Sequence, residues 1–137
     1  MKKQITILSL LVLVTATLFS CKKDNESVKA RIMGKWTVNK IVASGYTGVD
    51  VAKNGTFTYG KSTDYLDFKS SDDDVIELAL SGTKTIGDYT GTMDAFNIYL
   101  PEEGVSYCTV NILTDKELQF TAKLDKTNVV KVYYLTR

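Results

Sequence analysis

The sequence predicts an all-β domain, an antiparallel up-and-down β-barrel of about eight strands with a short N-terminal helix. Three observations predict this fold class. From residue 35 onward Val, Ile, Thr, Tyr and Phe dominate, and apolar residues alternate with polar ones. Turn residues interrupt this alternation at short, regular intervals. No stretch between two predicted strands provides a crossover helix, so neighbours are expected to pair antiparallel, and a long meander hides its edges by closing on itself.

One helix is predicted ahead of the strands. Ser27 can cap a helix over residues 28–33, and Gly34 can end it. Asn54-Gly55 lies between two short apolar runs, which predicts a tight hairpin. Pro101, the only proline, marks a loop with the three residues after it. The predicted strands are residues 35–43, 49–52, 56–59, 65–69, 75–80, 85–93, 95–100, 105–113, 117–124 and 129–136.

The period-two pattern also predicts which side chains point inward. Apolar residues at alternate positions mark the inner face of four strands: Leu66 and Phe68; Ile76, Leu78 and Leu80; Phe96, Ile98 and Leu100; and Leu118, Phe120, Ala122 and Leu124. Four lysines on strands alternate with apolar residues and are predicted to point outward, where they would also protect strand edges; these are Lys40, Lys69, Lys123 and Lys131.

The chain begins with the features of a secretory signal. Lys2 and Lys3 precede a mostly apolar, uncharged run over residues 5–19. A stable membrane span needs about 20 apolar residues. This run is shorter and contains several Ser and Thr, so a permanent N-terminal membrane helix is the weaker interpretation.

The end of that run, Leu18-Phe19-Ser20-Cys21, resembles the lipobox of bacterial lipoproteins. The resemblance implies that residues 1–20 are a signal peptide and that Cys21 is lipidated and becomes the mature N-terminus. It also implies an outer membrane lipoprotein that faces the periplasm or the cell surface. Residues 21–26 are then the lipidated Cys and a polar tether, and residues 27–137 are the barrel domain. Residues 22–26 also resemble the surface-export signal of Bacteroidetes lipoproteins, although a plain polar linker explains them equally well.

Composition excludes several functions. Without residues 1–20 the 17 Lys and Arg fall by two to 15 against 16 Asp and Glu. The mature chain therefore has a formal net charge of −1, and we expect no nucleic-acid partner. The chain has no His, which removes Ser-His-Asp catalysis and imidazole zinc sites. With Cys21 lipidated, Cys108 has no disulfide partner and is expected to pack as a small apolar residue. We expect no enzyme, no cofactor and no metal site.

Acidic clusters are interpreted as surface features. The densest group, Asp72-Asp73-Asp74 with Glu77, lacks the spacing and the glycine of a calcium loop, and a solvated hairpin tip explains it better. Two further pairs, Glu102-Glu103 and Asp88 with Asp94, are carboxylates of the kind that glycosidases use. Nothing in the sequence places either pair across a cleft.

Gly34-Lys35-Trp36 opens the first strand and resembles the Gly-x-Trp signature of the lipocalins. The resemblance implies that Trp36 closes one end of the barrel and that Arg137 stacks on it by a cation–π contact. Thr63-Asp64-Tyr65 matches a lipocalin triplet in letters only, because it comes too early in the chain. The chain is more similar to compact lipocalin-like lipoproteins of the Bacteroidetes, whose ends resemble residues 112–118, and the resemblance covers residues 28–137. An ordinary core Trp in an unrelated sandwich is the alternative.

The predicted function is binding of a small apolar or amphipathic molecule inside the barrel, with the membrane contacted through the N-terminal lipid. The alternative is a cell-surface module that binds a protein or glycan through its outer face or loops, around an interior filled by side chains. The sequence leaves the oligomeric state open. The expected ligand contacts are inward apolar and aromatic residues: Phe68, Leu78, Phe96, Ile98, Phe120 and Tyr134.

Overall fold

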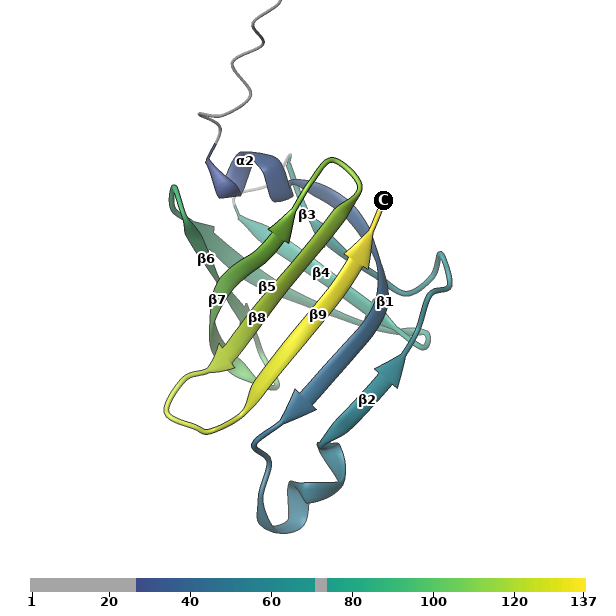
Figure 1. Ribbon diagram of the computed structural model, residues 1–137, viewed down its shortest axis with the longest axis vertical. Coiled ribbons are helices and arrows are strands. Elements are labelled where there is room, and N and C mark those ends of the chain that lie inside the picture. Colours follow the sequence, from purple (N-terminus) through teal and green to yellow (C-terminus); the bar gives the residue numbers. More distant parts are fainter. Residues whose placement is uncertain (1–26, 71–73) are drawn as a thin grey trace, which may run out of the picture.

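A computed structural model describes residues 27–70 and 74–137 (Figure 1). The predicted signal peptide, Cys21, the tether, and Asp72 and Asp73 of the acidic run lie outside the described residues. One short α-helix, one 3-10 helix and nine strands make up the described domain. They are α2 Val28–Ile32, β1 Gly34–Ser44, η2 Gly48–Lys53, β2 Gly55–Thr58, β3 Tyr65–Phe68, β4 Val75–Leu80, β5 Thr83–Gly91, β6 Ala95–Leu100, β7 Gly104–Leu113, β8 Glu117–Leu124 and β9 Val130–Thr136.

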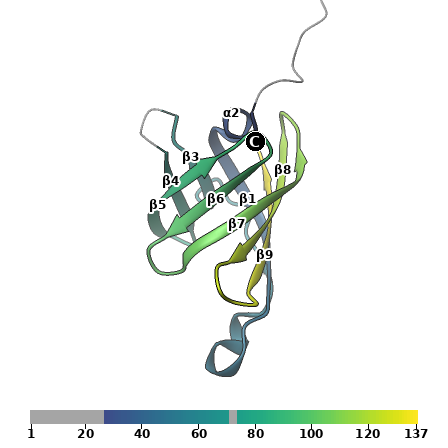
Figure 2. The same cartoon turned by 90° about the vertical axis from the view of Figure 1, so that its left-hand side faces the viewer.

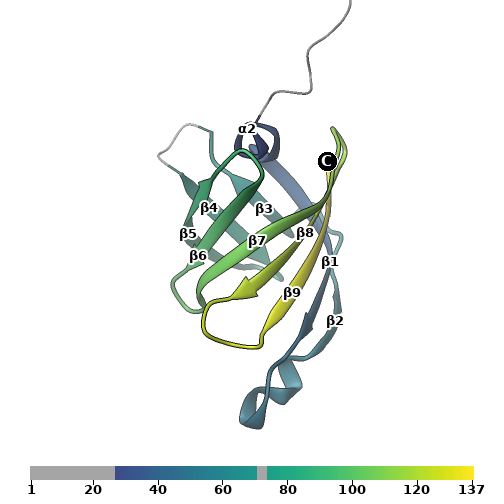
Figure 3. The same ribbon diagram turned by 60° about the vertical axis from the view of Figure 1, so that its left-hand side comes forward.

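Eight strands close into an antiparallel barrel. Each strand from β3 to β8 pairs with the next, β1 pairs with β3, and a β1–β9 pairing completes the ring. β2 is an extra strand that pairs with the second half of β1. Figures 2 and 3 show the sheet curling around a single interior. The predicted all-β, up-and-down barrel is confirmed, and its architecture fits a lipocalin-like barrel.

Strand β1 is long and pairs with three other strands. Its first half pairs with β3, its second half with β2, and its other edge with β9. A β-bulge between Val38 and Lys40 changes which positions point inward. Trp36 and Val38 are buried before the bulge, whereas Ile41 and Ala43 are buried after it.

Helix α2 and the last residue of the chain cover one end of the barrel, which we call the closed end (Figure 1). The Trp36 indole N–H donates a 2.7 Å hydrogen bond to the carbonyl of Ile32 in α2. The Arg137 guanidinium lies 3.8 Å from the centre of the Trp36 ring. It also donates to the carbonyls of Met33, at 2.8 Å, and Arg31, at 3.2 Å. The predicted contact between Trp36 and Arg137 is confirmed.

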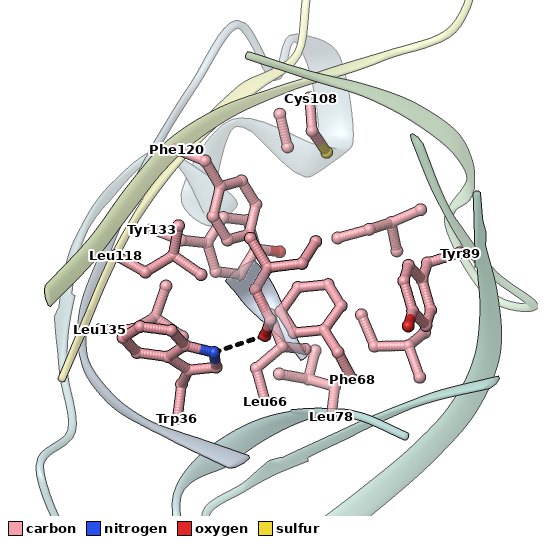
Figure 4. Close-up of a cluster of buried hydrophobic side chains, with 14 of the residues drawn as sticks. Trp36, Leu66, Phe68, Leu78, Tyr89, Cys108, Leu118, Phe120, Tyr133 and Leu135 are labelled. Atoms are coloured by element: carbon pink, nitrogen blue, oxygen red, sulfur yellow. Dashed lines mark hydrogen bonds between the residues drawn. The ribbon is translucent and has the colours of Figure 1, made fainter. Parts of the chain in front are cut away.

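Aromatic side chains pack together inside the barrel (Figure 4). Phe68, Phe96 and Phe120 are fully buried and meet edge to face, with ring centres 5.7 and 5.0 Å apart. Tyr89 packs on Phe68 at 5.1 Å, and Tyr133 stacks on Phe120 at 4.6 Å. Such pairs add about 1 kcal/mol each to the apolar area they bury, so this part of the interior is a packed core.

The predicted hairpin at Asn54-Gly55 is wrong, because residues 49–52 form part of helix η2 rather than a strand. Asn54 ends the helix, and its side chain bonds to the backbone of Tyr46. The Tyr46 N–H donates to Asn54 Oδ1 at 2.9 Å, and Asn54 Nδ2 donates to the Tyr46 carbonyl at 2.8 Å. This pair of bonds closes a longer loop, residues 45–54, which joins β1 to β2 opposite the closed end (Figure 1).

In the part of the chain that the structure covers, no helix combines the length and apolar character that crossing a membrane requires.

Candidate functional site

A cavity of about 580 Å³ occupies the end of the barrel opposite α2, which we call the open end. Its walls come from the second half of β1, the 45–54 loop, β2, the ends of β4, β8 and β9, and the turn between β6 and β7. The lining residues are Ile41, Ala43, Tyr46, Asp50, Ala52, Lys53, Phe57, Tyr59, Leu78, Leu80, Glu102, Glu103, Leu124, Lys131 and Tyr133. The volume falls within the range of about 300–1,000 Å³ that is typical of small-molecule sites.

The cavity exists because side-chain size changes along the barrel. The closed half holds Trp36 and three phenylalanines, whereas Ala43 and leucines line the open half. The ring of Tyr133 packs on Phe120 and also lines the cavity, so it forms the boundary between the core and the hollow end. The 45–54 loop and β2 extend the wall beyond the eight-stranded ring. The apolar surface of this cavity is therefore accessible without displacement of the packed core residues.

Three tyrosines give the apolar walls polar tips. Tyr46, Tyr59 and Tyr133 come from the loop, the segment after β2 and β9. Burial raises the pKa of Tyr133 well above its ordinary value, and the Glu103 carboxylate adds to the rise. Burial also raises the pKa of Tyr59. Both phenols therefore remain protonated at neutral pH and can donate hydrogen bonds.

Charged side chains gather at the same end. Lys131 Nζ lies 2.5 Å from Glu103 Oε1, and Lys53 Nζ lies 2.8 Å from Asp50 Oδ1. The Lys131 side chain is only 16% exposed, whereas that of Lys53 is 62% exposed. One ion pair is thus recessed inside the barrel wall, and the other lies on the loop at the mouth.

The six expected ligand contacts divide into three groups. Phe68, Phe96, Phe120 and Ile98 belong to the packed core and do not line the cavity. Leu78 lines the cavity, as expected of an inward residue near the open end. Tyr134 belongs neither to the packed core nor to the lining of the cavity.

The inward prediction for Tyr134 and the outward prediction for Lys131 are both wrong. Tyr133 and Leu135 are buried in β9, so Tyr134 points outward, where Lys40 Nζ lies 3.9 Å from its ring centre. Lys131 shares the inner face with Tyr133. Val130, Val132 and Tyr134 form the more apolar set of alternate positions, so the sequence pattern favours the wrong face of this strand.

Sequence reasoning also missed the roles of Tyr46, Tyr59 and Glu103. Tyr46 and Glu103 lie in a loop and a turn, where period-two patterns carry no directional information, and Tyr59 ends a short predicted strand to which no inner face is assigned. The sequence does carry one signal that these residues could line a cavity. All three lie at or next to the end of a predicted strand, and Tyr has an apolar ring with a polar hydroxyl. That signal does not reveal which strand ends share one end of the barrel.

Two observations on the described residues concern metal and thiol chemistry. No three of their His, Cys, Asp and Glu side chains are placed to hold a metal ion. Cys108 is buried, and burial raises the pKa of its thiol to about 12, so the nucleophilic thiolate is scarce at neutral pH. A second cavity of about 360 Å³ lies beside Asp64, whose carboxylate accepts a 2.8 Å bond from the Ser81 N–H. The first cavity is the one that combines apolar walls with polar tips.

Comparisons with protein-family models, with curated proteins and with solved structures find no match to this chain.

Proposed function

We propose that this protein is a lipid-anchored binding protein that takes a small amphipathic molecule into the open end of its lipocalin-like barrel. The observation that carries the proposal is the cavity of about 580 Å³, whose lining combines apolar side chains with tyrosines and charged groups, including a recessed ion pair. Cavities that bind small molecules combine mostly apolar lining with a few placed polar groups. The apolar part of the ligand would lie against Ile41, Leu78 and Leu80, and its polar group would meet the tyrosines and charges.

The binding function is tested by native mass spectrometry of the protein purified from its own host. We expect a retained small molecule, and its loss in Leu80→Trp, which fills the cavity. Ile86→Trp is the matched control, because Ile86 lies on the adjacent strand and its side chain is largely exposed outside the barrel. Equal retention by both variants would place the molecule elsewhere, and an empty wild-type protein that also binds no added amphiphile would contradict the function.

The anchor is proposed from the resemblance of residues 18–21 to a lipobox, with Cys21 carrying the lipid at the outer membrane. Two acyl chains are needed for stable anchoring. Cys21→Ala should therefore move the protein from the membrane to the soluble fraction, as followed by immunoblotting of cell fractions. Cys108→Ala is the control, and continued membrane retention of Cys21→Ala would defeat this part of the proposal.

A second candidate function is an interaction module that uses the outer face of the barrel. Ile86, Tyr99, Val105 and Tyr107 are exposed on the neighbouring strands β5, β6 and β7, and Tyr99 directly opposes Val105. Grouped exposed apolar residues commonly mark a binding surface. Crosslinking on intact cells should then capture a partner that Tyr99→Ser with Tyr107→Ser loses and Leu80→Trp keeps. Capture that is unaffected by the double variant would reject this candidate.

A further inference from the structure

The recessed lysine of the open-end cavity lies on a strand that is paired on both edges. Lys131 lies on β9 between β1 and β8, and it directly opposes Ala43 on one side and Ala122 on the other. Because both opposing residues are alanines, the aliphatic part of the Lys131 side chain has space beside it along the barrel wall. Among the ion-paired groups that line the cavity Lys131 is the least exposed, at 16% against 34% for Glu103 and 50% for Asp50.

The partner of Lys131 has a looser attachment. Glu103 lies in the turn between β6 and β7, where its backbone N–H bonds to the Leu100 carbonyl at 3.0 Å. Its carboxylate reaches inward to Lys131 Nζ through one oxygen, Oε1, at 2.5 Å. A side chain on an exposed turn can swing out to water at small cost, whereas the backbone of Lys131 is fixed by pairing with β1 and β8. The carboxylate of Glu103 is therefore the exchangeable member of the pair.

Two phenol hydroxyls add hydrogen-bond donors in the same cavity as Lys131, whose lining also includes the carboxylates of Asp50, Glu102 and Glu103. Within residues 27–70 and 74–137, neither the Tyr59 nor the Tyr133 hydroxyl has a hydrogen-bond partner. Both phenols are kept protonated by burial, and Lys131 is the nearby cation that acts on Tyr59. A group with accepting oxygens satisfies these donors, whereas an ammonium group adds further donors.

We propose, on the basis of the proposed binding function, that the ligand is an amphiphile with a carboxylate head group, which takes the place of the Glu103 carboxylate on the ammonium of Lys131. The apolar body of the ligand lies along Leu78, Leu80 and Ile41. Glu103 then serves as an internal substitute that neutralises Lys131 while the cavity holds no ligand. A charged lysine inside the barrel wall costs stability when it is unpaired, so such a substitute is required.

Decanoate, decanol and decylamine test the head group, because they share one alkyl chain. Each is titrated into the purified full-length protein by calorimetry, below its critical micelle concentration. We expect decanoate to bind most tightly and decylamine most weakly. Decylamine binding as tightly as decanoate would overturn the carboxylate inference and leave the binding function standing, whereas failure of all three to bind would reject both.

Two substitutions with opposite expected effects make the test sharper. Lys131→Met keeps the apolar stem and should weaken decanoate binding about tenfold or more, since it removes a charged hydrogen-bond partner. Glu103→Gln should strengthen decanoate binding about threefold or more, because the competing carboxylate is gone. An amine ligand would give the reverse signs and overturn the inference.

Matched controls come from outward positions. Lys123→Met and Glu117→Gln alter exposed residues of β8 outside the cavity and should leave decanoate binding unchanged. If Lys131→Met loses no more decanoate affinity than Lys123→Met does, the inference is overturned. Glu103 lies on a turn, so Glu103→Gln keeps the test decisive even if Lys131→Met fails to fold.

Discussion

Trp36 connects three parts of the closed end through one side chain. Its ring is fully buried, its indole N–H bonds to α2, and the guanidinium of Arg137 covers its face. Arg137 in turn bonds to carbonyls just before β1. The two residues therefore attach the helix and the last strand to the start of the barrel.

Replacing Trp36 by Ala should lower the free energy of unfolding by about 3–5 kcal/mol, because a large buried aromatic leaves a cavity behind. Urea unfolding followed by circular dichroism measures the loss. Arg137→Lys should cost less, about 1–2 kcal/mol, since a lysine keeps the charge but loses the planar fork. A loss below about 1 kcal/mol for Trp36→Ala would show that the ring does not close the barrel.

Cys108 should be chemically silent in the folded protein. Burial raises its pKa to about 12, so almost none of the thiol is ionised at pH 8, and the thiolate is the reactive form. Iodoacetamide should leave the peptide that contains Cys108 unmodified until urea unfolds the domain, as read by mass spectrometry. Rapid labelling of native protein at pH 8 would show that the strand opens to solvent.

At the scale of the element, the outer faces of β3, β4 and β5 share one charged network. Glu77 accepts a hydrogen bond from the Tyr65 hydroxyl and pairs with Lys84 at 3.2 Å and Lys69 at 3.4 Å. The hydrogen bond from Tyr65, followed by that from Lys84, lowers the pKa of Glu77 from its ordinary 4.5 to about 2. The carboxylate therefore ties three strands together above that pH.

This network predicts a pH-dependent contribution to stability. A lowered pKa means that the unfolded chain takes up the proton first, so the contribution is complete above about pH 5 and disappears as the pH falls towards 2. Glu77→Gln should lower the free energy of unfolding by about 1 kcal/mol at pH 7 and by almost nothing at pH 2. Urea titrations at both pH values measure the difference. Tyr65→Phe should show part of the same trend, and a difference independent of pH would contradict the assignment.

The junction between β1 and the 45–54 loop depends on close contact as well as on backbone angles. Gly45 and Gly48 both have positive φ, +86° and +62°. A Cβ on Gly45 would lie 1.9 Å from the carbonyl oxygen of Asn128, whereas a Cβ on Gly48 would meet nothing within 4 Å.

Gly48→Ala should therefore cost about 1 kcal/mol from the backbone alone, and Gly45→Ala clearly more, since the loop must also shift. Thermal unfolding of the two variants, compared side by side, isolates the contact. Equal losses of stability in the two variants would show that the loop can move away from Asn128 at no cost in free energy.

Strand pattern predicts much of this fold, and its failures have physical causes. On β6 and β8 one set of alternate positions is clearly more apolar, so the inner faces were predicted correctly. On β9 both sets are apolar, and burial of the Lys131 stem goes against the pattern. Residues 49–52 look like a strand by composition, but the Asn54 bonds to Tyr46 favour a helix and a longer loop. The cavity was not predictable, because it depends on which side chains leave space at one end.

At the scale of the whole molecule, closure of the barrel places the two faces of strand β8 in different surroundings, one in the core and one in solvent. Phe120 is fully buried among aromatic rings, and Lys123 on the same strand is exposed. Phe120→Asp should prevent folding, because an unpaired charge enters the core. Lys123→Asp should change the free energy of unfolding by about 0.5 kcal/mol or less. Circular dichroism distinguishes the two, and the opposite result would invert the register of β8.

Both α2 and Arg137 lie at the closed end, while the cavity opens at the other (Figure 1). A support or fusion partner joined at Ser27 or at Arg137 is therefore attached at the end of the barrel opposite the cavity. Under the proposed binding function, a ligand would enter the barrel from the side that faces away from such a support.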